Sequence, residues 1–210
     1  MISKGAKVGF SFVVCDKLQL GSDTKIGFLN YINIKELELR RKARIRHFNI
    51  LKGPIYVFFD ELAWIHSQNK ISGPILNFER KQKFSLGKGA QVMVKCLFDV
   101  TGSIQIGDNT TLAGAEIQMW THAFYVGKQK QVRLDGGITI GDNCYIGARV
   151  VICSGVSIVD STCIGANSTV SKSIQVPGLY VNQPLRYIEF DADKAISNLT
   201  TEIFPGVFEK

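Results

Sequence analysis

The sequence predicts an all-β protein in which short strands stack as the coils of a solenoid. Branched aliphatic side chains recur at every sixth position over two long tracts, and glycine often follows them directly. A period of six does not match the turn of an α-helix, whereas it fits a short strand followed by a turn. Three such units close one triangular coil of about eighteen residues, and each coil covers the aliphatic face of the next.

The aliphatic positions are expected to point into the core. The first tract comprises Ile2, Val8, Val14, Leu20, Ile26 and Ile32, and the second Ile140, Ile146, Ile152, Ile158, Ile164, Val170 and Val176. Between them the register slips but the period continues, at Leu39, Ile45, Leu51, Val57, Ile65, Ile71, Leu86, Val92, Phe98, Ile104, Ile106 and Leu112. A β-sandwich is the alternative, but its strands recur at a longer spacing without a fixed aliphatic position.

The period is lost between Leu112 and Ile140. We therefore predict a β-helix domain over residues 1–188 that is interrupted by an outward loop at about 118–137. Loops that leave a rigid solenoid commonly carry functional sites. Residues 189–210 lack the repeat and are expected to form a tail that caps the last coil or crosses to a neighbouring subunit.

The composition and net charge of the chain limit the classes of protein to which it can belong. The 210 residues carry 25 Lys and Arg against 18 Asp and Glu, a net charge of +7, and five Cys without a CxxC pair. We expect no disulfide framework and no metal site. No secretory leader or membrane-spanning stretch is visible, so we expect a cytoplasmic protein. The positive charge favours an anionic partner, but no nucleic-acid-binding motif accompanies it.

The C-terminal repeats resemble the hexapeptide-repeat acyltransferases, which fold as left-handed parallel β-helices. The resemblance rests on ITIGDNCYIGA at residues 138–148, IGANSTVSKS at 164–173 and the exit VNQPLRYI at 181–188. The N-terminal coils, with FLNYI at 28–32, WI at 64–65 and ISG at 71–73, look like the sugar and polysaccharide O-acetyltransferase branch. The resemblance implies a homotrimer with active sites at the subunit interfaces and acetyl-CoA as the acyl donor.

Acyl transfer from a thioester to a hydroxyl needs a base, and His is the usual one. The chain has three His, and His122 lies in the WTH segment at the start of the outward loop, after an IGDN run at residues 106–109. The family's catalytic His occupies the matching place, so we predict His122 as the general base. His47 and His66 are expected to be ordinary outward-facing side chains. The close His pair of the zinc-dependent carbonic anhydrases with a related fold is missing.

The base also needs a partner that orients it. Related sugar acetyltransferases place an Asn on the preceding coil, and the sequence has MVKC at residues 93–96 there, without an Asn. Glu116, Asp99, Asp135 or a backbone carbonyl are the alternatives.

For the donor, the resemblance implies that the Ala148 backbone lies near the thioester as an oxyanion donor or pantetheine contact. It places Ala166 and Ser171 along the pantetheine arm. Lys172 and Arg186 would meet the phosphates, because Lys and Arg form charge-assisted contacts with them.

The resulting hypothesis is an acetyl-CoA-dependent O-acetyltransferase that modifies a sugar hydroxyl of a surface polysaccharide or its precursor. The alternatives are N-acetylation of a xenobiotic or amino sugar, and a non-catalytic β-helix that serves as a scaffold or anion-binding subunit. The basic run from Arg40 to Arg46 could meet an anionic acceptor or a lipid headgroup surface, or be a solvated face. The aromatic residues Tyr56, Phe58, Phe59 and Trp64 could form a subunit interface or a peripheral membrane contact.

Overall fold

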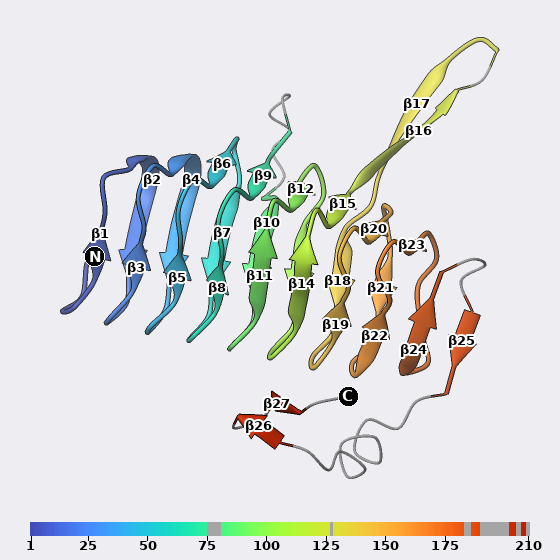
Figure 1. Ribbon diagram of the computed structural model, residues 1–210. Helices are drawn as coiled ribbons and strands as arrows, with labels where there is room; N and C mark the ends of the chain where they lie inside the picture. The colour runs from blue at the N-terminus through green and yellow to red at the C-terminus, as the bar shows by residue number, and fades with distance from the viewer. Residues whose placement is uncertain (75–80, 127, 183–185, 190–201, 205–206, 209–210) are drawn as a thin grey trace.

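A computed structural model of the protein describes residues 1–74, 81–126, 128–182, 186–189, 202–204 and 207–208. Over these residues the chain forms strands and turns and no helix, and most strands stack in parallel as a β-helix (Figure 1). The expected all-β solenoid is thus confirmed. In the described part, no helix has the length and apolarity that a membrane crossing requires.

Three faces make up the prism, and each coil contributes a strand to every face. The first face is the ten-stranded sheet β1 (Lys7–Val8), β3 (Lys25–Ile26), β5 (Arg44–Ile45), β8 (Trp64–Ile65), β11 (Gln91–Val94), β14 (Thr111–Ala115), β19 (Tyr145–Ile146), β22 (Thr162–Ile164), β24 (Gly178–Val181) and β25 (Arg186–Ile188). The other two faces form a thirteen-stranded sheet, joined through long strands that bend around a corner.

These long strands are β2 (Phe12–Leu20) and β4 (Tyr31–Leu39), whose second halves begin the second face. The second face continues with β7 (Tyr56–Phe59), β10 (Lys83–Leu86), β13 (Ile104–Ile106), β18 (Ile138–Ile140) and β21 (Ser157–Ile158). The third face begins with the first halves of β2 and β4 and continues with β6 (Ile50–Lys52), β9 (Lys70–Ser72), β12 (Leu97–Asp99), β15 (Gln118–Trp120), β20 (Val151–Ile152) and β23 (Thr169–Val170).

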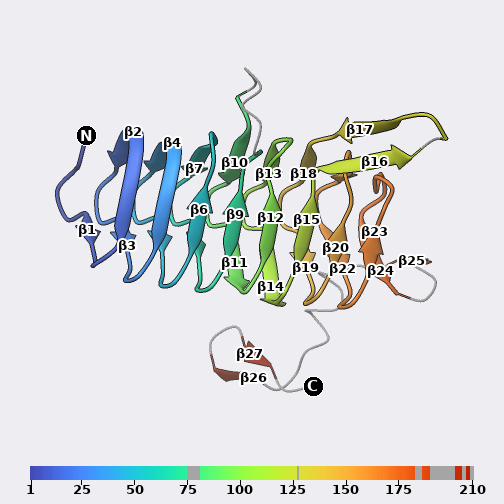
Figure 2. The same cartoon turned by 90° about the horizontal axis from the view of Figure 1, so that it is seen from above.

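Coils of different length share the same interior. Hydrogen bonds between most neighbouring coils join residues about one coil apart, for example 18 between Asp142 and Asp160 and 20 between Lys88 and Asp108. The separation rises to 27 between Asn69 and Cys96, and to 34 between Thr110 and Cys144. The second of these insertions holds the antiparallel hairpin β16 (His122–Val126) and β17 (Gln131–Asp135), which projects away from the stack (Figure 2).

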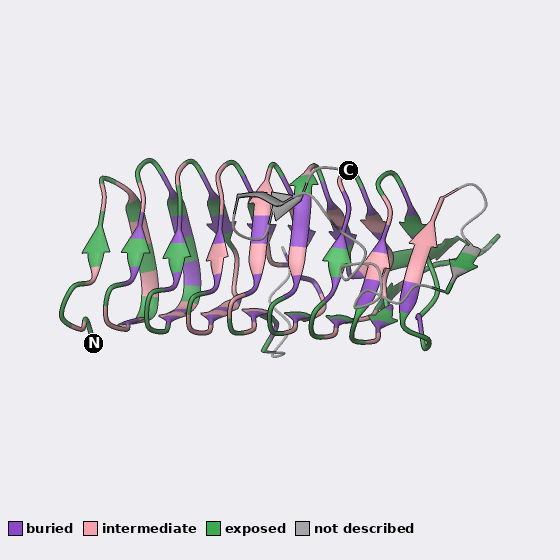
Figure 3. Cartoon of the chain, turned by 60° about the horizontal axis from the view of Figure 1, so that its bottom comes forward, coloured by how far each residue is buried: buried purple, intermediate pink, exposed green. Residues whose placement is uncertain are grey.

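The periodic aliphatic side chains fill the interior, as predicted for nearly all of them. Figure 3 colours the chain by the burial of each residue. Four exceptions have a structural cause. Val14 points outward because β2 pairs with β4 so that Val13 and Cys15 lie under Ile32 and Ile34. Ile2 and Val8, 63% and 48% exposed, belong to the first coil, which has a neighbour on one side only. At the other end, Ile174 pairs with Ile158 and is buried in place of Val176.

A ladder of buried Asn residues, which the period does not reveal, lines the corner between the first and third faces. Asn30 Oδ1 accepts a hydrogen bond from the backbone N–H of Asn49 at 2.9 Å. Asn49 and Asn69 do the same for the backbone N–H groups of Asn69 and Cys96. Because buried N–H groups are costly without partners, the ladder stabilises the turns of four successive coils in one register.

Two further hairpins follow the repeat. β24 pairs antiparallel with β25 at the end of the first face, and β26 (Glu202–Phe204) pairs with β27 (Val207–Phe208). The prediction that the aromatic residues at 56, 58, 59 and 64 form one surface group is partly wrong. Phe59 faces the core and is fully buried. Outward-facing Phe58 instead lies beneath the side chains of Arg40 and Lys83.

Candidate active site

The site is built where the third face ends and the projecting hairpin begins. β12 and β15 are parallel neighbours, in a register that pairs Asp99 with Trp120. Two residues beyond Trp120 the chain leaves the stack at His122, the first residue of β16. Parallel pairing therefore places the end of one coil beside the start of the hairpin, and brings a carboxylate and an imidazole together.

His122 Nδ1 lies 2.8 Å from Asp99 Oδ2. The His122 side chain is 29% exposed and that of Asp99 is 13% exposed, so the carboxylate is sheltered while the ring reaches the surface. The Phe124 ring meets the imidazole edge-on, with ring centroids 5.6 Å apart. This packing and the hydrogen bond together hold the ring in one orientation.

Hydrogen bonds keep the Asp99 carboxylate ionised. Burial raises the pKa of this carboxyl, but hydrogen bonds from Thr101, His122 and Thr121 outweigh it, so the pKa lies below the usual value. The Thr101 hydroxyl donates to Oδ1 at 2.8 Å, and the Thr121 backbone N–H donates to Oδ2 at 3.0 Å. An ionised carboxylate only accepts hydrogen bonds, so the imidazole donates through Nδ1–H, and in the neutral ring this leaves the lone pair on Nε2.

The backbone around this pair is also fixed. The Thr121 hydroxyl lies 2.9 Å from Asp99 Oδ2 and accepts a hydrogen bond from the Gly102 N–H at 2.7 Å. The Thr121 carbonyl accepts from the Gly136 N–H at 2.8 Å and from the Ser154 hydroxyl at 3.1 Å. Both strands of the hairpin base and the next coil therefore hold the segment that carries His122.

Among the alternatives for the orienting partner, the structure brings Asp99 to His122. Residues 93–96 do lie on the coil before His122, where Val94 pairs with Ala115. The register sets Leu97–Asp99 beside Gln118–Trp120, so Asp99 reaches the His122 ring instead. Glu116 pairs instead with Arg149 at 2.9 Å. Asp135 lies opposite His122 in the hairpin but contacts Arg133 at 2.8 Å.

The other two His residues have local contacts of their own. His47 Nδ1 accepts a hydrogen bond from the Phe28 backbone N–H at 2.9 Å, and His66 Nδ1 accepts one from the Ser67 N–H at 2.8 Å. Burial, followed by the charges of Arg46 and His47, lowers the pKa of His66. Neither ring contacts a carboxylate among the described residues, unlike that of His122.

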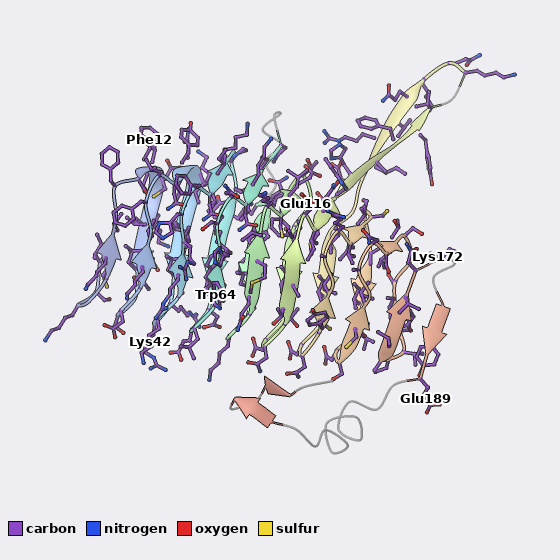
Figure 4. All side chains as sticks on the ribbon, in the orientation of Figure 1. Phe12, Lys42, Trp64, Glu116, Lys172 and Glu189 are labelled. Carbon is purple, nitrogen blue, oxygen red and sulfur yellow. The ribbon has the colours of Figure 1, made fainter. Side chains whose placement is uncertain are left out.

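The predicted donor-binding residues flank the last two strands of the third face. Ala148 precedes β20, while Ala166 precedes β23 and Ser171 and Lys172 follow it. Figure 4 places Lys172 toward the C-terminal end of the stack. Ser171 and Lys172 lie at the same corner as His122, about two rungs or 10 Å further along the axis. Ala148 and Ala166 occupy the opposite edge of this face, and the side chain of Arg186 lies outside the described residues.

Comparisons with known proteins agree with this fold. Residues 137–172 match the family described as bacterial transferase hexapeptide, six repeats. A curated protein of Lysinibacillus sphaericus, "Probable macrolide acetyltransferase", is 38% identical over 60 residues, 29% of this chain and 33% of that protein. The galactoside O-acetyltransferase of Escherichia coli K12 is 35% identical over 88 residues, 41% of this chain and 43% of that protein.

A solved structure of UDP-N-acetylglucosamine acyltransferase from Campylobacter jejuni covers 94% of this chain and 81% of its own, with a TM-score of 0.53 and 17% identity. This likeness concerns the fold alone. The chain spans less than half the length of the two curated relatives named above. Residues 137–172 therefore match the hexapeptide repeat of this family, and the described chain shares the β-helix fold.

The low pKa of Asp99 predicts how a substitution affects stability. A carboxyl with a lowered pKa in the folded state stabilises the fold above its unfolded-state pKa, and this contribution is lost as the pH falls through the folded-state value. Asp99→Asn should lower the free energy of unfolding by about 1–3 kcal/mol at pH 7. The difference from wild type should shrink below about pH 4. Urea unfolding at a series of pH values measures both.

Asp23→Asn is the matched control, because Asp23 is exposed and its positive φ of 58° suits Asn. It should leave the free energy of unfolding nearly unchanged at every pH. A difference for Asp99→Asn that stayed constant down to acid pH would contradict the pKa argument.

Proposed function

We propose that the protein is an acetyl-CoA-dependent O-acetyltransferase that acetylates a sugar hydroxyl of a surface polysaccharide or its precursor. The observation that carries the proposal is the contact between His122 and the ionised Asp99 at a corner of the β-helix. Asp99 supplies the orienting group for which the sequence offered no Asn, which favours an enzyme over a scaffold. The likeness to the galactoside O-acetyltransferase over 88 residues supports a sugar acceptor.

In this reaction His122 Nε2 takes the proton of the acceptor hydroxyl, and the oxygen attacks the thioester carbonyl carbon. Asp99 holds the Nδ1–H and stabilises the imidazolium that forms, as the carboxylate does in other carboxylate–histidine pairs. The tetrahedral intermediate then collapses, the C–S bond breaks, and the leaving thiolate takes the proton from His122. The products are an acetyl ester and the free thiol of coenzyme A.

The residues around β20 and β23 are the proposed donor site. Ala148 would contribute backbone polar groups to the pantetheine or the oxyanion, and Ala166 and Ser171 would line the arm. Lys172 is exposed and has no ion-pair partner among the described residues, so it is free to meet a phosphate. Arg186 would meet a second phosphate.

A homotrimer with active sites between subunits would give the projecting hairpin a surface on which to pack. The hairpin exposes Phe124, Tyr125, Val126, Val132 and Leu134, of which Tyr125 is 70% and Val126 is 78% exposed. Exposed apolar side chains that gather on one element mark an interaction surface. Because the hairpin begins at His122, a neighbouring subunit that covers the hairpin would also form one side of the proposed active site. Light scattering in solution measures this assembly.

A second candidate is acetylation of a small antibiotic-like molecule. The similarity over 60 residues to the probable macrolide acetyltransferase supports it. The same base would serve both reactions, so the acceptor separates them. Thiol release from acetyl-CoA with a panel of oligosaccharides, macrolides and amino sugars compares the acceptors directly.

His122→Ala should lower kcat by about 10²–10⁴-fold while the protein stays folded, because it removes the general base. The measurement is thiol release from acetyl-CoA with the best acceptor of the panel. His66→Ala is the control, because it removes an imidazole that lies away from the site. Turnover that survives His122→Ala unchanged would refute the assignment of the base, and coenzyme A that fails to bind would refute the acetyltransferase.

Lys172→Ala should weaken coenzyme A binding by about three- to tenfold and change kcat less, because an exposed cation gives a modest contact with phosphate. Arg186→Ala tests the second proposed phosphate contact in the same way. Titration calorimetry measures the affinity, with Lys52→Ala on an earlier coil as the control. An unchanged affinity in both variants would remove these residues from the donor site.

A further inference from the structure

A groove runs across the outer surface of the first face at its N-terminal end, far along the stack from His122. It has a volume of about 640 Å³ and is lined by residues 7–10, 25–28 and 44–47 on three successive coils. A smaller hollow of about 260 Å³ adjoins it and shares Arg44 and Arg46 with it. We call the two together the basic groove, because Lys7, Lys25, Lys42, Arg44 and Arg46 line it and no carboxylate does.

The cations of the basic groove differ from Arg40 and Arg41, which precede Lys42 in the sequence, in their contacts with the described residues. Arg40 lies within 3.5 Å of Glu38 and Asp60 carboxylate oxygens, and Arg41 pairs with Glu61 at 2.9 Å. In the described part of the chain, none of the five groove cations forms an ion pair or side-chain hydrogen bond. The basic run from Arg40 to Arg46 therefore divides into a neutralised part and an unpaired part.

The unpaired cations form a line along the axis of the β-helix. Lys7, Lys25 and Arg44 are register partners on β1, β3 and β5, so they follow one another at about 4.8 Å per rung. Lys42 and Arg46 flank Arg44, and Figure 4 places Lys42 at the edge of the stack near Trp64. Like charges at this spacing repel one another, and an anionic chain lying along the line would relieve the repulsion.

Aromatic side chains and an imidazole lie beside the cations of the basic groove. The Phe28 and His47 rings stack 5.5 Å apart at an angle of 4°, and Phe10 on the coil before them is 83% exposed. Trp64 lines the smaller hollow. Pyranose rings present C–H faces that pack on aromatic side chains, while their acidic substituents meet Lys and Arg.

We propose that the basic groove binds an acidic glycan chain and anchors the acceptor polymer at a distance from the catalytic His. The choice of a glycan as the ligand rests on the proposed function. The negative charge of the ligand is inferred from the unpaired cations of the basic groove. A nucleic acid fits less well, because no nucleic-acid-binding motif accompanies the cations in the sequence. A membrane fits less well, because Lys7, Lys25 and Arg44 form a single line along the axis, which suits a linear polymer better than a broad surface.

The test measures binding of a fluorescent oligogalacturonate in the absence of acetyl-CoA. Wild type should bind it, with an affinity that falls as salt rises, and should not bind a neutral maltodextrin of the same length. Lys25→Gln/Arg44→Gln should raise the dissociation constant by about tenfold or more. Lys52→Gln/Lys70→Gln is the matched control, because it removes two exposed charges from the third face on nearby coils.

If both double variants raised the dissociation constant for oligogalacturonate equally, the effect would come from net charge alone, and the proposal would be overturned. Tighter binding to single-stranded DNA or to phosphatidylglycerol vesicles than to oligogalacturonate would overturn the choice of ligand. Binding that persists in a protein without acetyl transfer activity would count against the proposed function while supporting the groove. Activity without glycan binding would contradict the groove alone.

Discussion

The structure depends on the parallel pairing of each strand with the strand one coil away. A single coil cannot bury its own aliphatic face, so every coil takes its core from its neighbours. This pairing fixes which residues of distant sequence lie on adjacent strands, and side chains at matching positions of successive coils then lie beside one another along the axis. The pair of Asp99 and His122, the Asn ladder and the line of cations in the basic groove are three such arrangements.

The same constraint explains where function could be added. Corners tolerate extra residues because these project outward and leave the packing of the core unchanged. The strands on either side of the hairpin pair in the usual register. The hairpin thus lifts His122 to the edge of the stack without disturbing β13 and β18, which pair directly across the insertion. The proposed base, His122, is held by the stacked strands on one side and by the projecting hairpin on the other.

The period of six predicted the fold and nearly the whole core, because the stacked rungs require an inward aliphatic residue at each strand. The prediction from the period failed at Val14, where the spacing between inward residues Val13 and Leu20 is one residue longer than six. It also failed at the two ends of the stack. The alignment with related sugar acetyltransferases pointed to residues 93–96 for the orienting group, whereas the register sets Leu97–Asp99 beside the His segment. Asp99 was one of three carboxylates that the sequence could not separate, because the local register decides which of them reaches the ring. Residence in the cytoplasm stays a prediction.

Nitrogen NMR of the His122 imidazole tests the central claim most directly, because the ionised Asp99 fixes the position of the ring proton. The account predicts that the neutral form of the ring carries its proton on Nδ1 and leaves Nε2 free. It also predicts that Asp99→Asn weakens this preference, while Glu116→Gln leaves it unchanged. A ring protonated at Nε2 in the wild type, or one that ignores Asp99→Asn, would contradict it.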